Sequence, residues 1–186
     1  MVDVKVKIDE YAAFPTMIYK FTADLGKDKH AHMSSYIKTK DDIQTEDDLY
    51  KISSFKPLVE TVQHTVKDIL EKLEYDYEKL EMTSMWGNHL KKGQSHPPHT
   101  HSNNLWSGVY FVESSKGSSP IQFFDPRAQA HNMQPKNKPN WQNSGMLQFS
   151  AEVGTGIIFP AWLMHWVPTT EADRVSVSWN ILLRGN

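Results

Sequence analysis

The sequence predicts a mainly β protein with one flanking helix, built as a double-stranded β-helix, the jelly-roll barrel. About eight short strand-like segments, bounded by residues that favour turns, indicate the β class. One longer segment with helical periodicity indicates the helix. Histidines occur both early and late in the series of strands, and a jelly roll brings such distant positions together at the mouth of the barrel.

The first half of the chain predicts two strands, a polar segment and a helix. Residues 2–9 alternate between apolar and polar side chains, and residues 14–21 form a second strand candidate in which Pro15 suits an edge. Residues 24–54 carry clusters of acids without clear periodicity, which predicts a solvated surface or a flap over a site. Residues 55–73 repeat apolar side chains at spacings of three and four, which predicts a helix packed outside the sheet.

The second half of the chain predicts a series of strands. Residues 80–90 read as a strand that enters the site, and residues 105–112 as a buried strand. Further short strands are expected at 121–127, 145–150 and 154–160, and the run 174–183 alternates as a strand does. The polar stretch 128–144 is long for a compact domain, so it is expected to be a loop that selects the substrate.

Three histidines predict a metal site. His99 and His101 stand two apart, so in an extended segment their imidazoles point to the same side. His165 follows a buried strand and a turn and is the candidate third ligand. The alternatives are a surface loop that carries the first two histidines and a buried, hydrogen-bonded role for the third.

A polar row on the last strand predicts a site for a small dicarboxylate. Arg174, Ser176, Ser178 and Asn180 share one face of the alternating run 174–183. The guanidinium presents a fork of donors that matches a carboxylate, and the Ser176 hydroxyl adds another donor. The alternative is an edge strand that turns this row to solvent.

Together these residues resemble the iron(II)- and 2-oxoglutarate-dependent oxygenases, most of all those of phages and marine bacteria, over residues 80–186. The resemblance also rests on the segments 107–110, 125–127 and 159–165 and on the Gly-Gln turn before the histidines. It implies a dioxygenase, by default a hydroxylase, whose substrate the sequence does not name. The usual ligand set of such enzymes is two histidines and one carboxylate.

The resemblance assigns the site residues. His99, His101 and His165 would hold iron(II), and Arg174 and Ser176 would bind the far carboxylate of 2-oxoglutarate, helped by Tyr110 or Ser107. His101 stands where the family has its carboxylate, and three neutral imidazoles also suit zinc or copper. The carboxylate most suited to join the metal is Asp125, while an alternative ligand pair would include Asn103.

Two other classes of protein stay open on these residues. A cupin-type metalloenzyme that does not use 2-oxoglutarate would share the barrel and the motif from Gly93 to His101, although the glutamate that follows in cupins is missing. A non-catalytic jelly-roll binding protein would explain the barrel but not the grouped polar residues.

Length and composition set the remaining expectations. The 186 residues suggest a single domain, with strands, polar segment and helix in 1–79 and the metal-binding core in 80–186. The net charge of −2 favours neither nucleic acid nor an acidic membrane as partner. There is no cysteine, so any metal must use His, Asp or Glu. The chain is expected to be soluble and cytoplasmic, in the host cytoplasm if a phage encodes it, and a homo-oligomer stays open.

Overall fold

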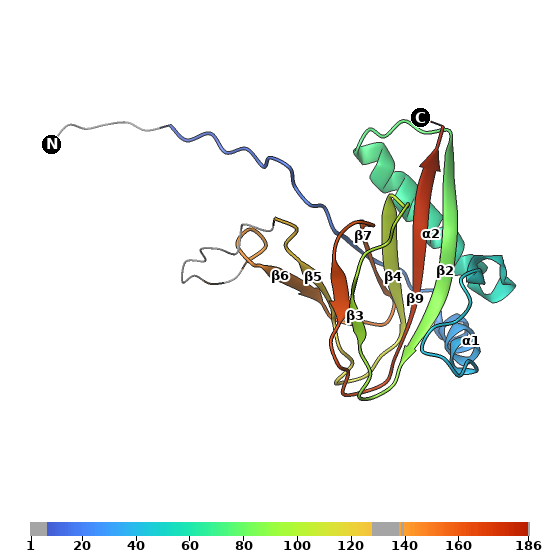
Figure 1. The fold of residues 1–186 in the computed structure, drawn as a ribbon. Helices are drawn as coiled ribbons and strands as arrows, with labels where there is room; N and C mark the ends of the chain where they lie inside the picture. Colours follow the sequence, from blue (N-terminus) through green and yellow to red (C-terminus); the bar gives the residue numbers. More distant parts are fainter. Residues whose placement is uncertain (1–6, 128–137, 139, 186) are drawn as a thin grey trace.

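Two antiparallel sheets face each other and make the predicted jelly roll (Figure 1). The structure is a computed structural model that describes residues 7–127, 138 and 140–185. One sheet has five strands in the order β1 (Tyr19–Thr22), β7 (Thr155–Pro160), β4 (Trp106–Glu113), β9 (Arg174–Arg184) and β2 (Lys79–Leu90). The other has four, in the order β3 (His96–His99), β8 (His165–Val167), β5 (Ile121–Phe124) and β6 (Met146–Phe149).

The helices cover the outer face of the five-stranded sheet (Figure 1). Helix α2 (Lys56–Lys72) confirms the helix expected at residues 55–73, and its buried residues share a core with Trp179 of β9. No helix among the described residues has the length and apolar character needed to cross a membrane.

The five-stranded sheet is buried on both faces, so it belongs to two apolar cores. Along β4, Trp106 and Tyr110 pack into the core under the helices, whereas Val109 and Phe111 pack into the core between the two sheets. Successive strand residues point to opposite faces, so one strand serves both cores. The functional site described below opens from the core between the sheets.

The polar segment 24–54, predicted as a solvated surface or a flap without clear periodicity, has secondary structure of its own. It contains helix α1 (Lys27–Lys38) and two 3-10 helices, η1 (Leu49–Lys51) and η2 (Ser53–Phe55). Only Met33, Ser34 and Ile37 are buried along α1, which is too few to give a clear helical pattern in the sequence. Ile37 fits because β2 has a glycine beneath it: a Cβ on Gly87 would lie 2.3 Å from the Ile37 side chain.

Residues 7–18, the first described part of the chain, contain no strand. The strand expected at residues 2–9 falls largely outside the described residues, and residues 7–9 are not in a strand. Of the strand expected at 14–21, only Tyr19 to Phe21 belong to β1, which continues to Thr22. Phe14 is 98% exposed and has a φ of 57°, which is incompatible with an extended strand. In the second candidate, strand-forming residues alone therefore did not suffice before Tyr19, where β1 begins to pair with β7.

Candidate active site

The three predicted histidines come together at the mouth of the barrel. One ligand nitrogen from each of His99, His101 and His165 lies within 4.8 Å of the other two. His99 ends β3 and pairs with His165 at the start of β8, while the His101 backbone N–H donates to the Ala161 carbonyl at 2.8 Å. Strand β3, the segment that follows it and strand β8 each therefore contribute one imidazole to the cluster.

Two of these imidazoles are oriented by backbone carbonyls. Nδ1 of His99 lies 2.8 Å from the Pro97 carbonyl oxygen, and Nδ1 of His165 lies 2.8 Å from the Leu163 carbonyl oxygen. A proton on each Nδ1 satisfies the carbonyl and leaves Nε2 with a free lone pair. Histidines that bind a metal usually donate their other ring N–H to a carbonyl or carboxylate in this way, which fixes the orientation of the ring.

Burial keeps His96, His101 and His165 neutral. It lowers the pKa of His165 from 6.5 to about 3 and that of His101 from 6.5 to about 4, with neighbouring histidines adding to the effect. The pKa of His96 also falls to about 4, through burial and then through His99 and Arg174. Neutral imidazoles are the form that binds metal, so the site is ready for a cation at neutral pH.

The metal-free protein is expected to lose stability between pH 7 and pH 5. Unfolded histidines bind protons below about pH 6.5, whereas His101 and His165 in the folded state do so only near pH 4 and pH 3. The unfolded state therefore binds more protons in this window, and the free energy of unfolding falls as the pH falls. Thermal unfolding of the metal-free protein at several pH values measures this effect.

The matched comparison for this pH effect is His165→Asn, which removes one buried imidazole. The thermal unfolding midpoint of the variant should fall less between pH 7 and pH 5, because one of the buried imidazoles that cause the fall is gone. Most carboxylates titrate below this pH range, so they contribute little to the difference. A wild-type midpoint that rose on acidification would contradict the expected sign.

Two cavities that share several lining residues adjoin the histidines. The inner cavity, about 40 Å³, is lined by a polar row and by apolar walls. Its polar lining includes Asn88, Arg174, Ser176 and Ser178, and Phe159 is among its apolar walls. The outer cavity, about 330 Å³, shares Trp86, His96, His99 and His101 with the inner one, and its other lining residues are Gln44, Asp47, Ser84 and Asn180. The inner space suits one small polar group and the outer space a larger molecule.

Arg174 is a buried cation whose partner is missing from the described residues. It is 3% exposed, its guanidinium carbon lies 5.0 Å from the centre of the Phe111 ring, and its Nε has no hydrogen-bond partner. Burial lowers its pKa from 12.5 to about 10, so it stays charged at neutral pH. Oδ1 of Asn88, which is also buried, has no partner either. Unpaired buried polar groups are costly, so both atoms indicate a ligand in the inner cavity.

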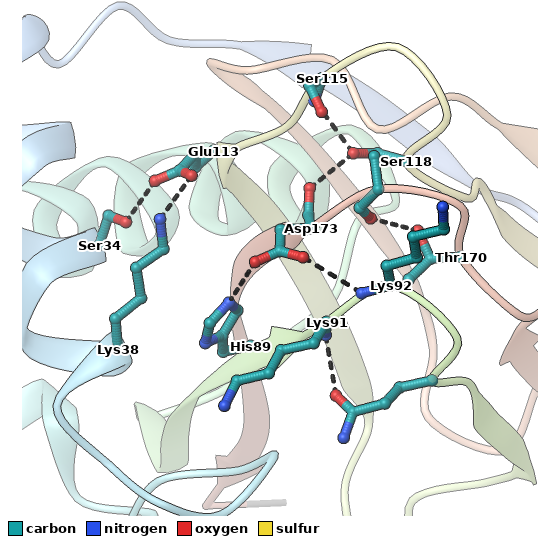
Figure 2. A network of polar contacts seen from close by, with 12 residues as sticks. Ser34, Lys38, His89, Lys91, Lys92, Glu113, Ser115, Ser118, Thr170 and Asp173 are labelled. Atoms are coloured by element: carbon teal, nitrogen blue, oxygen red, sulfur yellow. Dashed lines mark hydrogen bonds and ion pairs between the residues drawn. The ribbon is translucent and has the colours of Figure 1, made fainter.

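A polar network fixes the point at which β9 begins (Figure 2). The Asp173 carboxylate accepts the Lys92 N–H at 3.1 Å and lies 3.2 Å from Nε2 of His89. The Asp173 carbonyl accepts the Ser118 hydroxyl at 2.8 Å. Since Asp173 immediately precedes Arg174, these contacts from two turns hold the guanidinium at the inner cavity.

Tyr110 does not lie at the site, in contrast to its predicted role in binding the co-substrate. Its hydroxyl donates to the Ala23 carbonyl at 2.6 Å and lies 2.7 Å from Nε2 of His30, on the helix side of the sheet. Ser107 points to the other side of the sheet, where its hydroxyl donates to Oδ1 of Asn180 at 2.6 Å. Ser107 therefore supports a residue of the outer cavity and lines neither cavity itself.

Neither alternative ligand belongs to the histidine cluster. Asp125 lies in a different cavity, where its carboxylate accepts from Nε of Arg127 at 2.9 Å. Asn103 occupies an exposed turn with a φ of 59°. Among the described residues, the group that can hold a metal at this place consists of His99, His101 and His165. The loop expected at 128–144 as a selectivity element lies mostly outside the described residues.

Sequence reasoning missed His96. Its ring centre lies 4.4 Å from that of His99, and it lines both cavities. The two positions are three apart in the sequence, so a regular strand would point them to opposite faces. The register of β3 shifts between them, which brings both rings to the same side. The paired prolines at 97 and 98 were the available signal of an irregular strand.

The fold and the site together define a jelly-roll protein with a histidine metal centre next to an anion pocket. The chain matches the family described as "Putative 2OG-Fe(II) oxygenase" over residues 84–180, just over half of its length. It therefore belongs to the 2OG-Fe(II) oxygenase family, as the sequence motifs predicted, and is an oxygenase that depends on iron(II), 2-oxoglutarate and oxygen. The matched region contains all three histidines and Arg174. The search of curated proteins gave no match.

Solved structures with the same fold include two prolyl hydroxylases and an iron-bound protein. A prolyl-4-hydroxylase of Pseudomonas putida is 12% identical, with a TM-score of 0.64 over 92% of this chain and 87% of that one. The collagen prolyl hydroxylase of Paramecium bursaria Chlorella virus-1, solved with 2-oxoglutarate, is 12% identical, with a TM-score of 0.61 over 91% and 96%. HygX of Streptomyces hygroscopicus, solved with iron, is 12% identical, with a TM-score of 0.62 over 90% and 82%. At such identities the likeness concerns the fold alone.

Proposed function

We propose that this oxygenase is a hydroxylase in which His99, His101 and His165 hold iron(II) and Arg174 and Ser176 bind the far carboxylate of 2-oxoglutarate. The observation that carries the proposal is the buried, unpaired Arg174 in a cavity that also contains the three histidines. A dicarboxylate can reach both places at once, with one end at the metal and the other at the guanidinium.

The donor set fits a divalent cation that must also accept a charged ligand. Three neutral imidazoles leave the full double charge of iron(II) uncompensated, whereas a carboxylate in the place of His101 would neutralise part of it. The two negative charges of 2-oxoglutarate supply that compensation when it binds. Bound iron(II) supplies the chemistry that couples decarboxylation of 2-oxoglutarate by oxygen to oxidation of a C–H bond.

The residues of the inner cavity orient the co-substrate. The Arg174 guanidinium offers paired donors to one carboxylate, and Ser176, which is 1% exposed, can add its hydroxyl from the same face of β9. Ser178 accepts a hydrogen bond from Nδ2 of Asn88 at 3.1 Å, which keeps the adjacent polar wall in place. A volume of about 40 Å³ suits a carboxylate group, so the keto-acid end extends toward the histidines.

Apolar side chains exclude water from the reacting centre. Phe159 is 2% exposed, lies with its ring centre 4.5 Å from that of His165, and lines the inner cavity with Val109 and Ile121. Two other aromatic residues of the core segments lie elsewhere: Trp106 packs on Tyr19 in the helix-side core, and Trp166 stacks on Phe124. A dry wall beside the histidines limits loss of the oxidant to solvent.

We also propose that residues 1–79 and 80–186 form one domain in a cytoplasmic protein. The contacts between the two parts support the first point, because β1 pairs with β7 and the core of α2 includes residues of β9. The net charge of −2 supports a small-molecule partner over nucleic acid or a charged membrane.

Anaerobic titration tests the proposed function. Wild-type protein loaded with iron(II) should develop a weak visible charge-transfer band when 2-oxoglutarate is added, because the keto acid chelates the metal. Succinate, which lacks the keto group, is the matched control and should give no band. Tight metal binding without a band would favour a cupin-type enzyme that does not use 2-oxoglutarate, and would overturn the proposal.

A further inference from the structure

The outer cavity is bordered by a segment that lies along the free edge of β2. The Thr45 N–H donates to the Gly87 carbonyl at 3.0 Å, and the Met85 N–H donates to the Asp47 carbonyl at 2.8 Å. The His89 N–H donates to the Ile43 carbonyl at 2.8 Å. Residues 43–48 therefore extend the sheet at its edge and hold two side chains, Gln44 and Asp47, at the cavity.

The three consecutive acids of this segment have different partners. Glu46 accepts a hydrogen bond from the Tyr36 hydroxyl and forms an ion pair with Lys40 at 3.2 Å. Asp48 forms an ion pair with Lys51 at 3.4 Å. Asp47 lies between them, and within the described part of the chain its carboxylate forms no ion pair. It is also the acid of the three that lines the outer cavity.

The other lining residues do not compensate the charge of Asp47. Among the residues that the structure describes, no lysine or arginine lines the outer cavity. Both polar atoms of the Asn180 amide are hydrogen-bonded: Oδ1 accepts from the Ser107 hydroxyl, and Nδ2 donates to Oγ of Ser84 at 2.9 Å. Ser84 thus accepts one hydrogen bond and keeps its own proton for another acceptor. The cavity wall therefore offers a negative charge at the exposed Asp47, which marks its mouth, and a neutral donor at the half-buried Ser84.

We propose that the substrate of this enzyme carries a positively charged amino group, which Asp47 binds at the mouth of the outer cavity. This inference rests on the proposed function, since it places the C–H bond to be oxidised next to the histidines. The Ser84 hydroxyl can donate to an oxygen of the same molecule. A cavity of about 330 Å³ accommodates a reacting part of amino-acid size.

A pair of probes with the same shape tests the role of charge. Choline and 3,3-dimethylbutan-1-ol differ in the positive charge of the nitrogen, and neither can ligate a metal through that position. Each gives one sharp methyl proton signal, which broadens when the molecule binds beside paramagnetic iron(II). In protein loaded anaerobically with iron(II) and 2-oxoglutarate, we expect choline to bind about fivefold more tightly than the alcohol. This ratio corresponds to about 1 kcal/mol, the contribution of a solvent-accessible ion pair.

Two variants test whether the preference for choline comes from Asp47. Asp47→Asn should remove the preference for choline, whereas Asp48→Asn, which changes the neighbouring acid that pairs with Lys51, should preserve it. Equal affinities of wild type for the two probes, or no broadening of either signal, would overturn the inference. So would a preference that survives in Asp47→Asn. The visible band of 2-oxoglutarate in the same samples reports separately on the proposed function, so the two failures are distinguishable.

Discussion

Replacement of Arg174 by methionine is expected to weaken the binding of 2-oxoglutarate by at least about 30-fold, because removing one partner of a buried charge pair costs about 2 kcal/mol or more. Metal affinity should stay unchanged, since Arg174 is not in the histidine cluster. The metal-free variant should be at least as stable as wild type, because the change removes an unpaired buried cation and retains most of its volume. Titration of the visible band and thermal unfolding measure the two effects.

The matched control for this variant is Arg184→Met at the other end of β9. Arg184 is exposed and pairs with Glu81 at 2.8 Å, far along the strand from both cavities. The Arg184→Met variant should bind 2-oxoglutarate with the affinity of wild type. A parallel loss of metal and 2-oxoglutarate binding in Arg174→Met would contradict the assignment of this residue to the co-substrate.

Replacement of His165 by alanine is expected to lower metal affinity by more than about 100-fold. Even the loss of a residue that only hydrogen-bonds to a metal ligand lowers metal affinity by about 10-fold to 100-fold. In wild type, metal at 100 times its dissociation constant should stabilise the protein by about 2.7 kcal/mol. That stabilisation should almost vanish in the variant. Metal content after dialysis and the shift of the unfolding midpoint on adding metal measure the effect.

The control for His165→Ala is His64→Ala. His64 lies on α2, is largely exposed and has Asp68 at 3.7 Å as its neighbour, so its loss removes an imidazole without touching the site. Metal stabilisation should be intact in this variant. If His165→Ala still bound metal as wild type does, the metal would have to lie elsewhere.

The sequence predicted best where a side-chain pattern repeats over a long element. Residues 55–73 predicted α2 and residues 174–183 predicted β9, because one face of each element differs in polarity from the other. The alternation on β9 also predicted that Arg174, Ser176 and Ser178 share a face, and all three line the inner cavity. Local pattern was enough for these elements.

The sequence did not predict which residues of β4 face the site and which face the helices. Seven of its eight residues are buried, because helices cover one face and the second sheet covers the other. Such a strand carries no polar side that would tell the two directions apart. Tyr110 and Ser107 were therefore both candidates for the site, and the packing of α1 against the sheet placed the Tyr110 hydroxyl on the far face.

By itself, the sequence determined the class of fold, the positions of most strands and the residue types of a metal and carboxylate site. The tertiary structure decided which of those residues meet. A shift of register brought His96 beside His99, and edge pairing with β2 placed Asp47 at the outer cavity. Both outcomes depend on hydrogen bonds between segments far apart in the chain, and the periodicity of a single segment contains no information about its partner.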